Sequence, residues 1–452
     1  MTYSLLLAVI SLSCFLSATV SAESPNFVVI IGDDLSPDDL GCYGNKGIRT
    51  PHLDSLAAAG LRFDRAFLTC SSCSPSRSSI MTGRYPHATG AAELHQPLPA
   101  NQIVFPELLK AAGYFTGVAG KWHLGPNARK GFDKILGGGE SGAEEWLTLL
   151  RARPKDKPFF LWLASFDPHR DYKPGAIDPP HQPSDVRVPP FLPDNAETRG
   201  DLAMYYDEIG RLDQNVGQVL AELEKQEVAK DTIVIFMADN GRPFPRCKTT
   251  IYDSGVRTPL VVRWPAKVQA GQSRQQLVSS IDLSSTILEL ADVKAGPSFQ
   301  GQSFAGALTD EKASARSEVY SEHNWHDYQA HERSVRTERF LYIRNSFPQL
   351  TGSPPADAVR SPTYQKMIEL EAAGKLPVEQ RGCFLAPRAK EELYDVVADP
   401  HQLKNLATAP GQAETLAELR FKLDRWIEKF DDKIPEKPTP DKYDRKTGKL
   451  PK

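Results

Sequence analysis

The sequence TCSSCSPSRSSIMTGR, from Thr69 to Arg84, places a cysteine, a proline and an arginine at the start of a predicted helix. Pro75 suits the first helical position, because its fixed φ matches the helix and its missing N–H is no loss there. Cys73 then lies just before the helix N-terminus, where free N–H groups and the helix dipole favour an anion and lower the pKa of a thiol. Arg77, one turn further on, can point back at the same anion. From these residues alone, a half-buried cysteine in a Ser-rich turn is an equally good interpretation.

Four continuous apolar runs predict strands that are buried on both faces. They span residues 27–31, 114–119, 158–164 and 232–238. Polar side chains follow the runs in turn: Asp33 and Asp34, then Lys121 and His123, then His169, then Asp239 and Asn240. Parallel order in one sheet would bring these four strand ends to one edge, around Cys73, where open α/β sheets bind ligands. The ordinary alternatives are a solvated loop, a surface lysine and a structural histidine.

The acidic strand ends predict a metal site. Asp33, Asp34, Asp239 and Asn240 offer carboxylate and amide oxygens, which are the ligands of a hard cation. This irregular set favours Ca²⁺ over Mg²⁺, because Mg²⁺ demands a tight octahedral shell. Zinc is not expected, since no cluster of histidines and cysteines accompanies these residues.

Length and charge restrict the class of protein. The chain has 452 residues and a net charge of −3, so it can bury a sizeable core, and neither a nucleic-acid partner nor a basic membrane surface is suggested. Residues 1–22 contain an apolar run and end in Val-Ser-Ala, which predicts a secretory signal peptide. We therefore expect an exported protein, periplasmic, secreted or of lysosomal type. A buried N-terminal helix or a membrane anchor is the alternative for this segment, but its apolar run is short for a bilayer span, so no stable anchor is expected.

The composition changes near residue 296, beyond which segments are shorter and more charged. We predict a large first domain over 23–295, a C-terminal α+β subdomain over 296–430, and a disordered Lys- and Pro-rich tail over 431–452. The smaller elements expected are strands at 256–264, 317–322 and 340–343, and helices at 51–59, 105–112, 282–291 and 413–430. Thr50 and Asp282 are the predicted N-caps of two of these helices.

The motif around Cys73 has a known counterpart. Cys-x-Pro-x-Arg, followed by Ser-Ser-Ile-Met-Thr-Gly-Arg, resembles the signature of the type I sulfatases of the alkaline-phosphatase-like superfamily. Gly-Lys-Trp-His-Leu-Gly at 120–125 and Glu-Leu-Tyr-Asp at 392–395 resemble further motifs of that family, in the same order. The resemblance implies an alkaline-phosphatase-like fold, with 23–295 as the catalytic domain and the helix at 413–430 beside the main sheet.

The resemblance also implies a cofactor set and a mechanism of sulfuryl transfer. Cys73 would be oxidised to Cα-formylglycine by a formylglycine-generating enzyme and would join Asp33, Asp34, Asp239 and Asn240 around the cation. One hydroxyl of its hydrated form attacks sulfur, and the second expels sulfate with help from His123. His169 is the implied general acid toward the leaving oxygen or nitrogen. The sulfate oxygens are stabilised by the cation and by three basic residues, Arg77, Lys121 and Lys248.

Two further runs resemble the heparan N-sulfatase branch: Asp167-Pro-His-Arg170 and Asn-Gly-Arg-Pro-Phe-Pro at 240–245. Lys248 stands where that branch holds the sulfate with a basic residue, typically Arg; a lysine keeps the charge but loses bidentate recognition. The resemblance implies hydrolysis of the N-sulfate of terminal glucosamine in heparan-like chains. The substrate-binding candidates are Arg170, Arg246, His323, His326 and His331.

Three other functions stay open at this point: an O-sulfatase on another sulfated polysaccharide, a phosphodiesterase or phosphonate hydrolase of the same superfamily, and an inactive secreted glycan-binding protein. Retention of Cys73, of both acidic motifs and of the basic residues argues against the last. The expected partners are a sulfated glycan and the formylglycine-generating enzyme, and a homodimer is one option for the oligomeric state.

Overall fold

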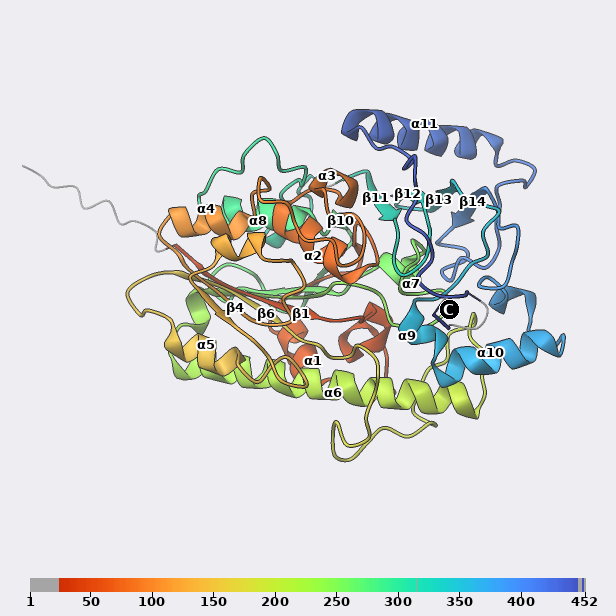
Figure 1. The fold of residues 1–452 in the computed structure, drawn as a ribbon. Coiled ribbons are helices and arrows are strands. Elements are labelled where there is room, and N and C mark those ends of the chain that lie inside the picture. The colour runs from red at the N-terminus through yellow and green to blue at the C-terminus, as the bar shows by residue number, and fades with distance from the viewer. Residues whose placement is uncertain (1–23, 315, 446–448, 451–452) are drawn as a thin grey trace, which may run out of the picture.

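The structure, a computed structural model, describes residues 24–314, 316–445 and 449–450. The predicted signal peptide, residues 1–22, lies outside the described residues. Figure 1 shows a central sheet between two layers of helices, with a smaller sheet on the C-terminal side of the molecule. The predicted α/β architecture with a small second sheet is therefore confirmed.

The central sheet has eight strands in the order β5-β4-β6-β1-β7-β8-β2-β9. All of them run parallel except β8, which is antiparallel to β7 and to β2. Their bounds are β1 Asn26–Gly32, β2 Leu61–Phe63, β4 Phe115–Gly120, β5 Lys134–Leu136, β6 Phe159–Ala164, β7 Thr232–Ala238, β8 Leu260–Arg263 and β9 Gln272–Arg274. The four predicted buried strands are β1, β4, β6 and β7, whereas the strand expected at 256–264 is shorter.

The strand registers bring four strand ends to one edge. Ile31 of β1 pairs with Ala164 of β6 and with Met237 of β7, and Ala164 also pairs with Gly120 of β4. The polar residues that follow these strands therefore leave the sheet side by side. The parallel arrangement predicted from the apolar runs is confirmed.

The two faces of the sheet pack against different helices (Figure 1). Val29 and Trp162 belong to the core beneath α2, α4 and α8, whereas Val28 and Leu161 belong to the core above α1, α5 and α6. The helix bounds are α1 Pro51–Ala58, α2 Cys73–Thr82, α4 Phe105–Ala111, α5 Trp146–Ala152, α6 Ala196–Lys225 and α8 Asp282–Leu290. Shorter elements are β3 Ala66–Phe67, β10 Val278–Ser279, α3 Pro86–Thr89 and α7 Asp253–Val256.

The second sheet is antiparallel and has four strands, β11 Glu318–His323, β12 Glu332–Thr337, β13 Phe340–Asn345 and β14 Glu391–Asp395. The helix α11, Ala413–Phe430, packs on this sheet, where Leu419 and Trp426 share a core with Val335 and Tyr342. Its predicted place beside the main sheet is therefore wrong, because its apolar face is covered by the small sheet. Two further helices, α9 (Ala356–Val359) and α10 (Pro362–Ala372), lie nearby, and α10 contacts α6.

Thr50 occupies the predicted N-cap position of α1 without a side-chain cap bond, whereas Asp282 is not the N-cap of α8. The hydroxyl of Thr50 accepts from the amide of Gly41 at 3.0 Å instead of capping α1. Asp282 is the first residue of α8, and its carboxylate accepts from the amides of Ser279 and Gln302 at 2.9 and 2.7 Å. Both side chains therefore tie their helix to a neighbouring loop.

The described residues after Asp431, which are 432–445 and 449–450, include ordered anchoring contacts that the predicted disordered tail did not anticipate. Asp432 forms a buried ion pair with Arg333, Thr439 bonds to Glu93, and Tyr443 is buried with its hydroxyl 2.9 Å from Ser353. Composition indicated disorder here because Lys and Pro are frequent, but three anchoring side chains outweigh that tendency. Within the described residues, no helix combines the length and the apolarity that crossing a bilayer requires.

Candidate active site

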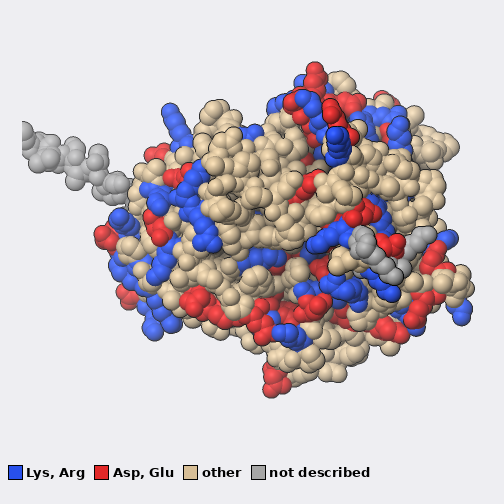
Figure 2. Space-filling model, in the orientation of Figure 1, with Lys and Arg blue, Asp and Glu red and all other residues tan. Residues whose placement is uncertain are grey.

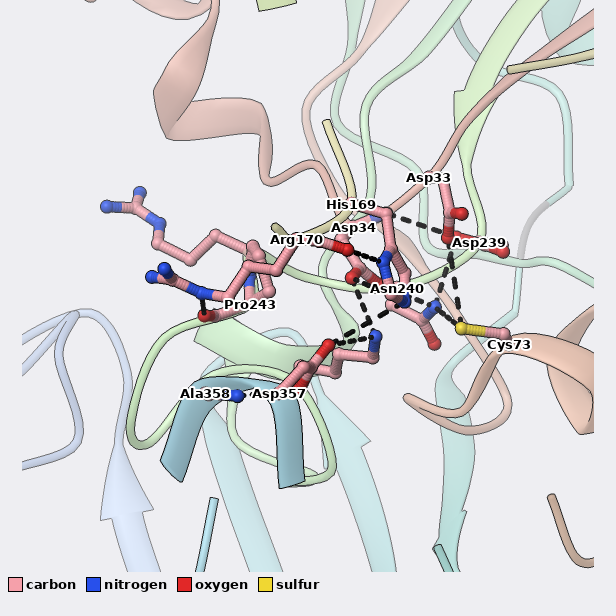
Figure 3. A network of polar contacts seen from close by, with 12 residues as sticks. Asp33, Asp34, Cys73, His169, Arg170, Asp239, Asn240, Pro243, Asp357 and Ala358 are labelled. Atoms are coloured by element: carbon pink, nitrogen blue, oxygen red, sulfur yellow. Dashed lines mark hydrogen bonds and ion pairs between the residues drawn. The ribbon is translucent and has the colours of Figure 1, made fainter. Parts of the chain in front are cut away.

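The start of α2 meets the edge of the sheet where the four strands end. The helix begins at Cys73 itself, two residues earlier than predicted, and this cysteine is 2% exposed. Its Sγ lies 3.2 Å from Nδ2 of Asn240 and 3.8 Å from Oδ1 of Asp33 (Figure 3). The structure thus brings the predicted nucleophile and the predicted metal ligands together.

Three buried carboxylates and one amide form an acidic cluster at this edge: Asp33, Asp34, Asp239 and Asn240. Nδ2 of Asn240 donates to Asp34 at 3.0 Å and to Asp239 at 3.1 Å. Burial raises the pKa of Asp34 to about 7, against the effect of Lys248 and helped by Asp33. It likewise raises the pKa of Asp239 to about 6. Burial therefore opposes the ionisation of Asp34 and Asp239, whereas at Asp33 Lys121 and the other nearby basic groups outweigh burial and hold the pKa well below its usual range.

Three buried basic side chains contact these carboxylates. Nε of Arg77 lies 2.7 Å from Asp239, Nζ of Lys248 lies 2.6 Å from Asp34, and Nζ of Lys121 contacts Asp33. Nη2 of Arg77 is buried without a hydrogen-bond partner among the described residues. The three basic side chains predicted to contact the sulfate oxygens therefore all lie among the carboxylates beside Cys73.

The predicted activation of the Cys73 thiol is wrong. Burial raises its pKa to about 12, and Asp33 and Asp34 add to this effect while Lys121 and Lys248 oppose it. Burial of the sulfur outweighs the helix dipole on which the prediction rested. An unmodified thiol here stays protonated at neutral pH, which makes it a poor nucleophile.

His123 forms a pair with a histidine that the motifs did not indicate. Its Nε2 lies 2.7 Å from Nδ1 of His95, and its own Nδ1 is buried without a partner among the described residues. Burial, together with Lys121, Arg77 and His95, lowers the pKa of His123 to about 3. The ring is therefore neutral at physiological pH and can accept a proton.

His169 follows β6, and its ring lies beside Asp34 of the acidic cluster. Its Nδ1 hydrogen-bonds the carbonyl of Arg170 at 2.5 Å, and its Nε2 lies 3.9 Å from Asp34. Burial and Lys248 lower its pKa. Because Nδ1 donates to a carbonyl, the neutral ring has no proton on Nε2, so donation from Nε2 requires the imidazolium form.

Asp357, on α9, is a site residue that sequence reasoning missed. Its Oδ2 lies 3.4 Å from Nζ of Lys248 and 3.6 Å from Nε2 of His169 (Figure 3). No motif surrounds it, and it is more than 100 residues from its partners in the sequence, so only the folded chain reveals it. His95 was also missed, because no motif surrounds it, although it is only 28 residues from His123.

The substrate-binding candidates are not all at the site. His326 is, because its Nδ1 lies 2.7 Å from the hydroxyl of Ser72, next to Cys73. His323 and His331 instead contact Glu332 and Ser346 within the C-terminal subdomain.

The two arginine candidates are occupied elsewhere. The guanidinium of Arg170 points away from Cys73 and pairs with Asp201 at 2.7 and 2.9 Å (Figure 3). Arg246 donates to the carbonyls of His401 and Gln402 and stacks on Tyr252. The structure therefore does not bring either guanidinium to the cluster, because internal partners hold both.

The donor set fits a hard divalent cation. Oδ1 of Asn240 is buried among carboxylates without a hydrogen-bond partner in the described part of the chain. An oxygen in this position is available to bind a metal ion. Asp33, Asp34 and Cys73 present ligand atoms within 4.8 Å of one another. Carboxylate and amide oxygens suit Ca²⁺ or Mg²⁺ rather than a softer metal.

Comparisons with known proteins agree with this site. The sulfatase family model matches residues 25–148 and 140–293, and the model named N-sulphoglucosamine sulphohydrolase, C-terminal, matches residues 246–349. Human N-sulphoglucosamine sulphohydrolase is 34% identical, over 90% of this chain and 90% of its own. An ulvan-active sulfatase of Formosa agariphila is 32% identical, over 90% of this chain and 75% of its own.

Solved structures support the fold. A structure titled as a complex with its substrate D-glucosamine-2-N,6-O-disulfate matches with a TM-score of 0.71 at 20% identity, covering 91% of this chain and 99% of the other. A 2-O glycosaminoglycan sulfatase matches with a TM-score of 0.68 at 23% identity, covering 91% and 93%. Together with the family match and the two relatives, these comparisons show that the chain belongs to the sulfatase family and hydrolyses sulfuric esters or sulfamates.

Proposed function

We propose that this protein hydrolyses sulfate groups of a sulfated glycan and that its substrate is the N-sulfate of terminal glucosamine in heparan-like chains. The observation that carries the proposal is the similarity to human N-sulphoglucosamine sulphohydrolase, which extends over 90% of both chains. The match of residues 246–349 to the C-terminal region of that enzyme type supports it further. A sulfamate requires proton donation to its leaving nitrogen, and His169 lies beside the cluster for this task.

In this proposal, each side chain of the cluster has one task. Cys73, as Cα-formylglycine, carries the nucleophile, and the neutral ring of His123 accepts a proton. Lys121 and Lys248 turn from their carboxylates to the sulfate oxygens and neutralise the charge there. Arg77 stays on Asp239 and fixes the end of β7. His169 gives its proton to the leaving nitrogen.

Asp33, Asp34, Asp239 and Asn240 would hold the divalent cation, which we propose to be Ca²⁺. When bound, it supplies positive charge that polarises the nucleophile and the sulfate oxygens. The cation also relieves the repulsion among three buried carboxylates, so its binding and the stability of the fold are linked. We further propose that the protein is exported and that a formylglycine-generating enzyme modifies Cys73.

An O-sulfatase on another polysaccharide is the second candidate. The similarity to an ulvan-active sulfatase, at 32% identity over 90% of this chain, favours it. The two candidates share all the chemistry around Cys73 and differ only in the atom that leaves.

The substrate test uses protein produced together with a formylglycine-generating enzyme. It is incubated with N-sulfoglucosamine, with glucosamine 6-sulfate and with 4-nitrophenyl sulfate, and the released sulfate is measured. We expect release from the N-sulfated sugar and not from the 6-O-sulfated one. Release from glucosamine 6-sulfate alone would identify an O-sulfatase, and release from 4-nitrophenyl sulfate alone would exclude both sugars as substrates.

Ca²⁺ is expected to raise the melting temperature of chelator-treated protein by about 3–8 °C, because a ligand at 100 times its Kd stabilises the folded state by about 2.7 kcal/mol. Differential scanning calorimetry with and without Ca²⁺ measures the shift. Asp34→Asn should remove most of it, whereas Asp424→Asn, at an exposed position on α11, should leave it intact. A larger shift with Mg²⁺ would contradict the choice of Ca²⁺, and no shift with either ion would contradict a cation site.

A further inference from the structure

Asp357 brings a carboxylate from the C-terminal subdomain into the active site. It lies on α9, and its Oδ2 faces Nζ of Lys248 at 3.4 Å and Nε2 of His169 at 3.6 Å. Its Oδ1 accepts from the amide of Ala358 at 2.7 Å, which fixes the orientation of the group. The residue lies beyond both stretches that the family models match, 25–293 and 246–349.

This carboxylate is a permanent hydrogen-bond acceptor. Burial alone would raise its pKa, but Lys248, His169 and His326 hold the pKa of Asp357 well below its usual range. An ionised carboxylate has no proton to donate. Figure 2 shows Lys and Arg side chains, with acidic ones among them, gathered in the hollowed region beside α9.

The position of Asp357 corresponds to the leaving-group side of the substrate. In an in-line displacement, the nucleophile and the leaving atom lie on opposite sides of the atom that is attacked. In the view of Figure 3, Asn240 is drawn between Cys73, which carries the proposed nucleophile, and Asp357, which lies beside His169, the proposed general acid. Asp357 is therefore placed to contact the atom that bridges sulfur and the sugar.

The charge of Asp357 is a cost for any bound sulfate, because like charges repel at short distance. Lys248 and His169 offset part of this cost, and a hydrogen-bond donor on the substrate would offset more of it. The bridging nitrogen of a sulfamate carries an N–H, whereas the bridging oxygen of a sulfate ester carries no hydrogen. A carboxylate at this point therefore treats the two substrate classes differently, in the same way that sites built for one polar group reject analogues that lack it.

We propose that Asp357 is the specificity-determining residue for N-sulfate, and that its Oδ2 accepts a hydrogen bond from the N–H that bridges sulfur and the sugar. In the reaction sulfur forms an S–O bond with the nucleophile carried by residue 73 and its S–N bond breaks. The nitrogen keeps the electron pair and takes a proton from the imidazolium form of His169, and the product is an amine whose N–H groups still face Asp357. The proposal rests on the proposed N-sulfate substrate. It adds one residue by which the enzyme would distinguish a sulfamate from a sulfate ester.

The test compares Asp357→Ala with the wild-type enzyme on N-sulfoglucosamine and on 4-nitrophenyl sulfate, which has no N–H and a leaving group that needs little protonation. We expect kcat/KM on N-sulfoglucosamine to fall about 100-fold, in the range of a hydrogen bond to a charged group. On 4-nitrophenyl sulfate we expect a change of less than about threefold, because the ester lacks the donor. Asp424→Ala, an aspartate on the surface of α11, is the matched control and should leave both rates unchanged.

Each possible result of this comparison tests a different part of the proposal. An equal loss on both substrates would show that Asp357 only supports Lys248, and no loss on either would show that it has no part in catalysis; both overturn the specificity proposal. If Asp357→Ala does not fold, the isosteric Asp357→Asn, which lacks the charge, should still lower the ratio of the two kcat/KM values at least about tenfold. A wild-type enzyme that hydrolyses only the ester would overturn the proposed function itself, and this result is distinct from an unaltered ratio in the variant.

Discussion

Replacing Cys73 with alanine is expected to lower kcat for sulfate release at least about 10⁴-fold, the scale seen when a nucleophile is removed. The reason is that, in the proposed mechanism, the neighbouring carboxylates hold the cation and Lys121 and Lys248 contact the sulfate, so none of these described side chains can take its place. The measurement is sulfate release by Cys73→Ala at saturating substrate. Its fold should be unchanged, because the side chain loses one buried sulfur and no strong hydrogen bond.

Cys70→Ala is the matched control. Cys70 is also buried and lies three residues away, but its Sγ contacts only the carbonyl of Ser72, at 3.9 Å. Its replacement should leave kcat within about twofold, since surface and packing changes away from the chemistry act on stability rather than on the transition state. Cys73→Ser should show one burst and then stop, with a mass increase equal to one SO₃ group, because a single hydroxyl can accept the sulfuryl group but cannot expel sulfate. Full turnover by Cys73→Ala would contradict the mechanism.

Replacing Arg170 with alanine is expected to destabilise the fold by about 3–5 kcal/mol, the cost of leaving one member of a buried ion pair unpaired. Its guanidinium forms two hydrogen bonds with Asp201 and lies between the rings of Tyr172 and Phe244. The side chains of Arg170 and Asp201 are only 4% and 3% exposed, so water cannot replace the lost partner. Urea denaturation followed by circular dichroism measures the change in the free energy of unfolding.

Two variants show whether the ion pair is responsible. Arg170→Met combined with Asp201→Asn should recover more than half of the loss, because removing both charges leaves no buried charge unpaired. Arg199→Ala breaks the exposed pair with Asp194 and should cost less than about 1 kcal/mol. A small cost for Arg170→Ala, accompanied by a large rise in KM, would restore the substrate-binding role that the sequence suggested.

The sequence was sufficient for the core of the fold and for the centre of the site. The buried parallel strands could be predicted because β1 and β7 are continuous apolar runs. The candidate site residues follow directly after these strands. Cys73, Lys121 and His123 were found because they lie in local motifs that identify the family. At these positions, the motif that identifies the family also contains the chemically active side chains, so one short stretch of sequence indicates both.

The remaining errors have one physical origin, which is contact between distant segments. Asp357 and His95 reach the site through tertiary structure and have no motif of their own. The pKa of Cys73 is raised rather than lowered because the folded chain buries the thiol. Arg170 was assigned to substrate from its place next to His169, but its long side chain turns back to α6. A single sequence contains no direct record of such contacts.

The burial of Cys73 also sets an order of events during biosynthesis. Thr69 accepts a hydrogen bond from the amide of Glu322, Ser72 is bonded to His326, and Cys73 is 2% exposed. A modifying enzyme cannot reach this side chain once β11 has docked on the segment before α2. The proposed oxidation of Cys73 would therefore belong to the interval in which about the first 80 residues are available and the C-terminal subdomain has not yet closed over them. A chain that folds faster than it is modified would be stable, would bind its cation, and would stay inactive for its lifetime.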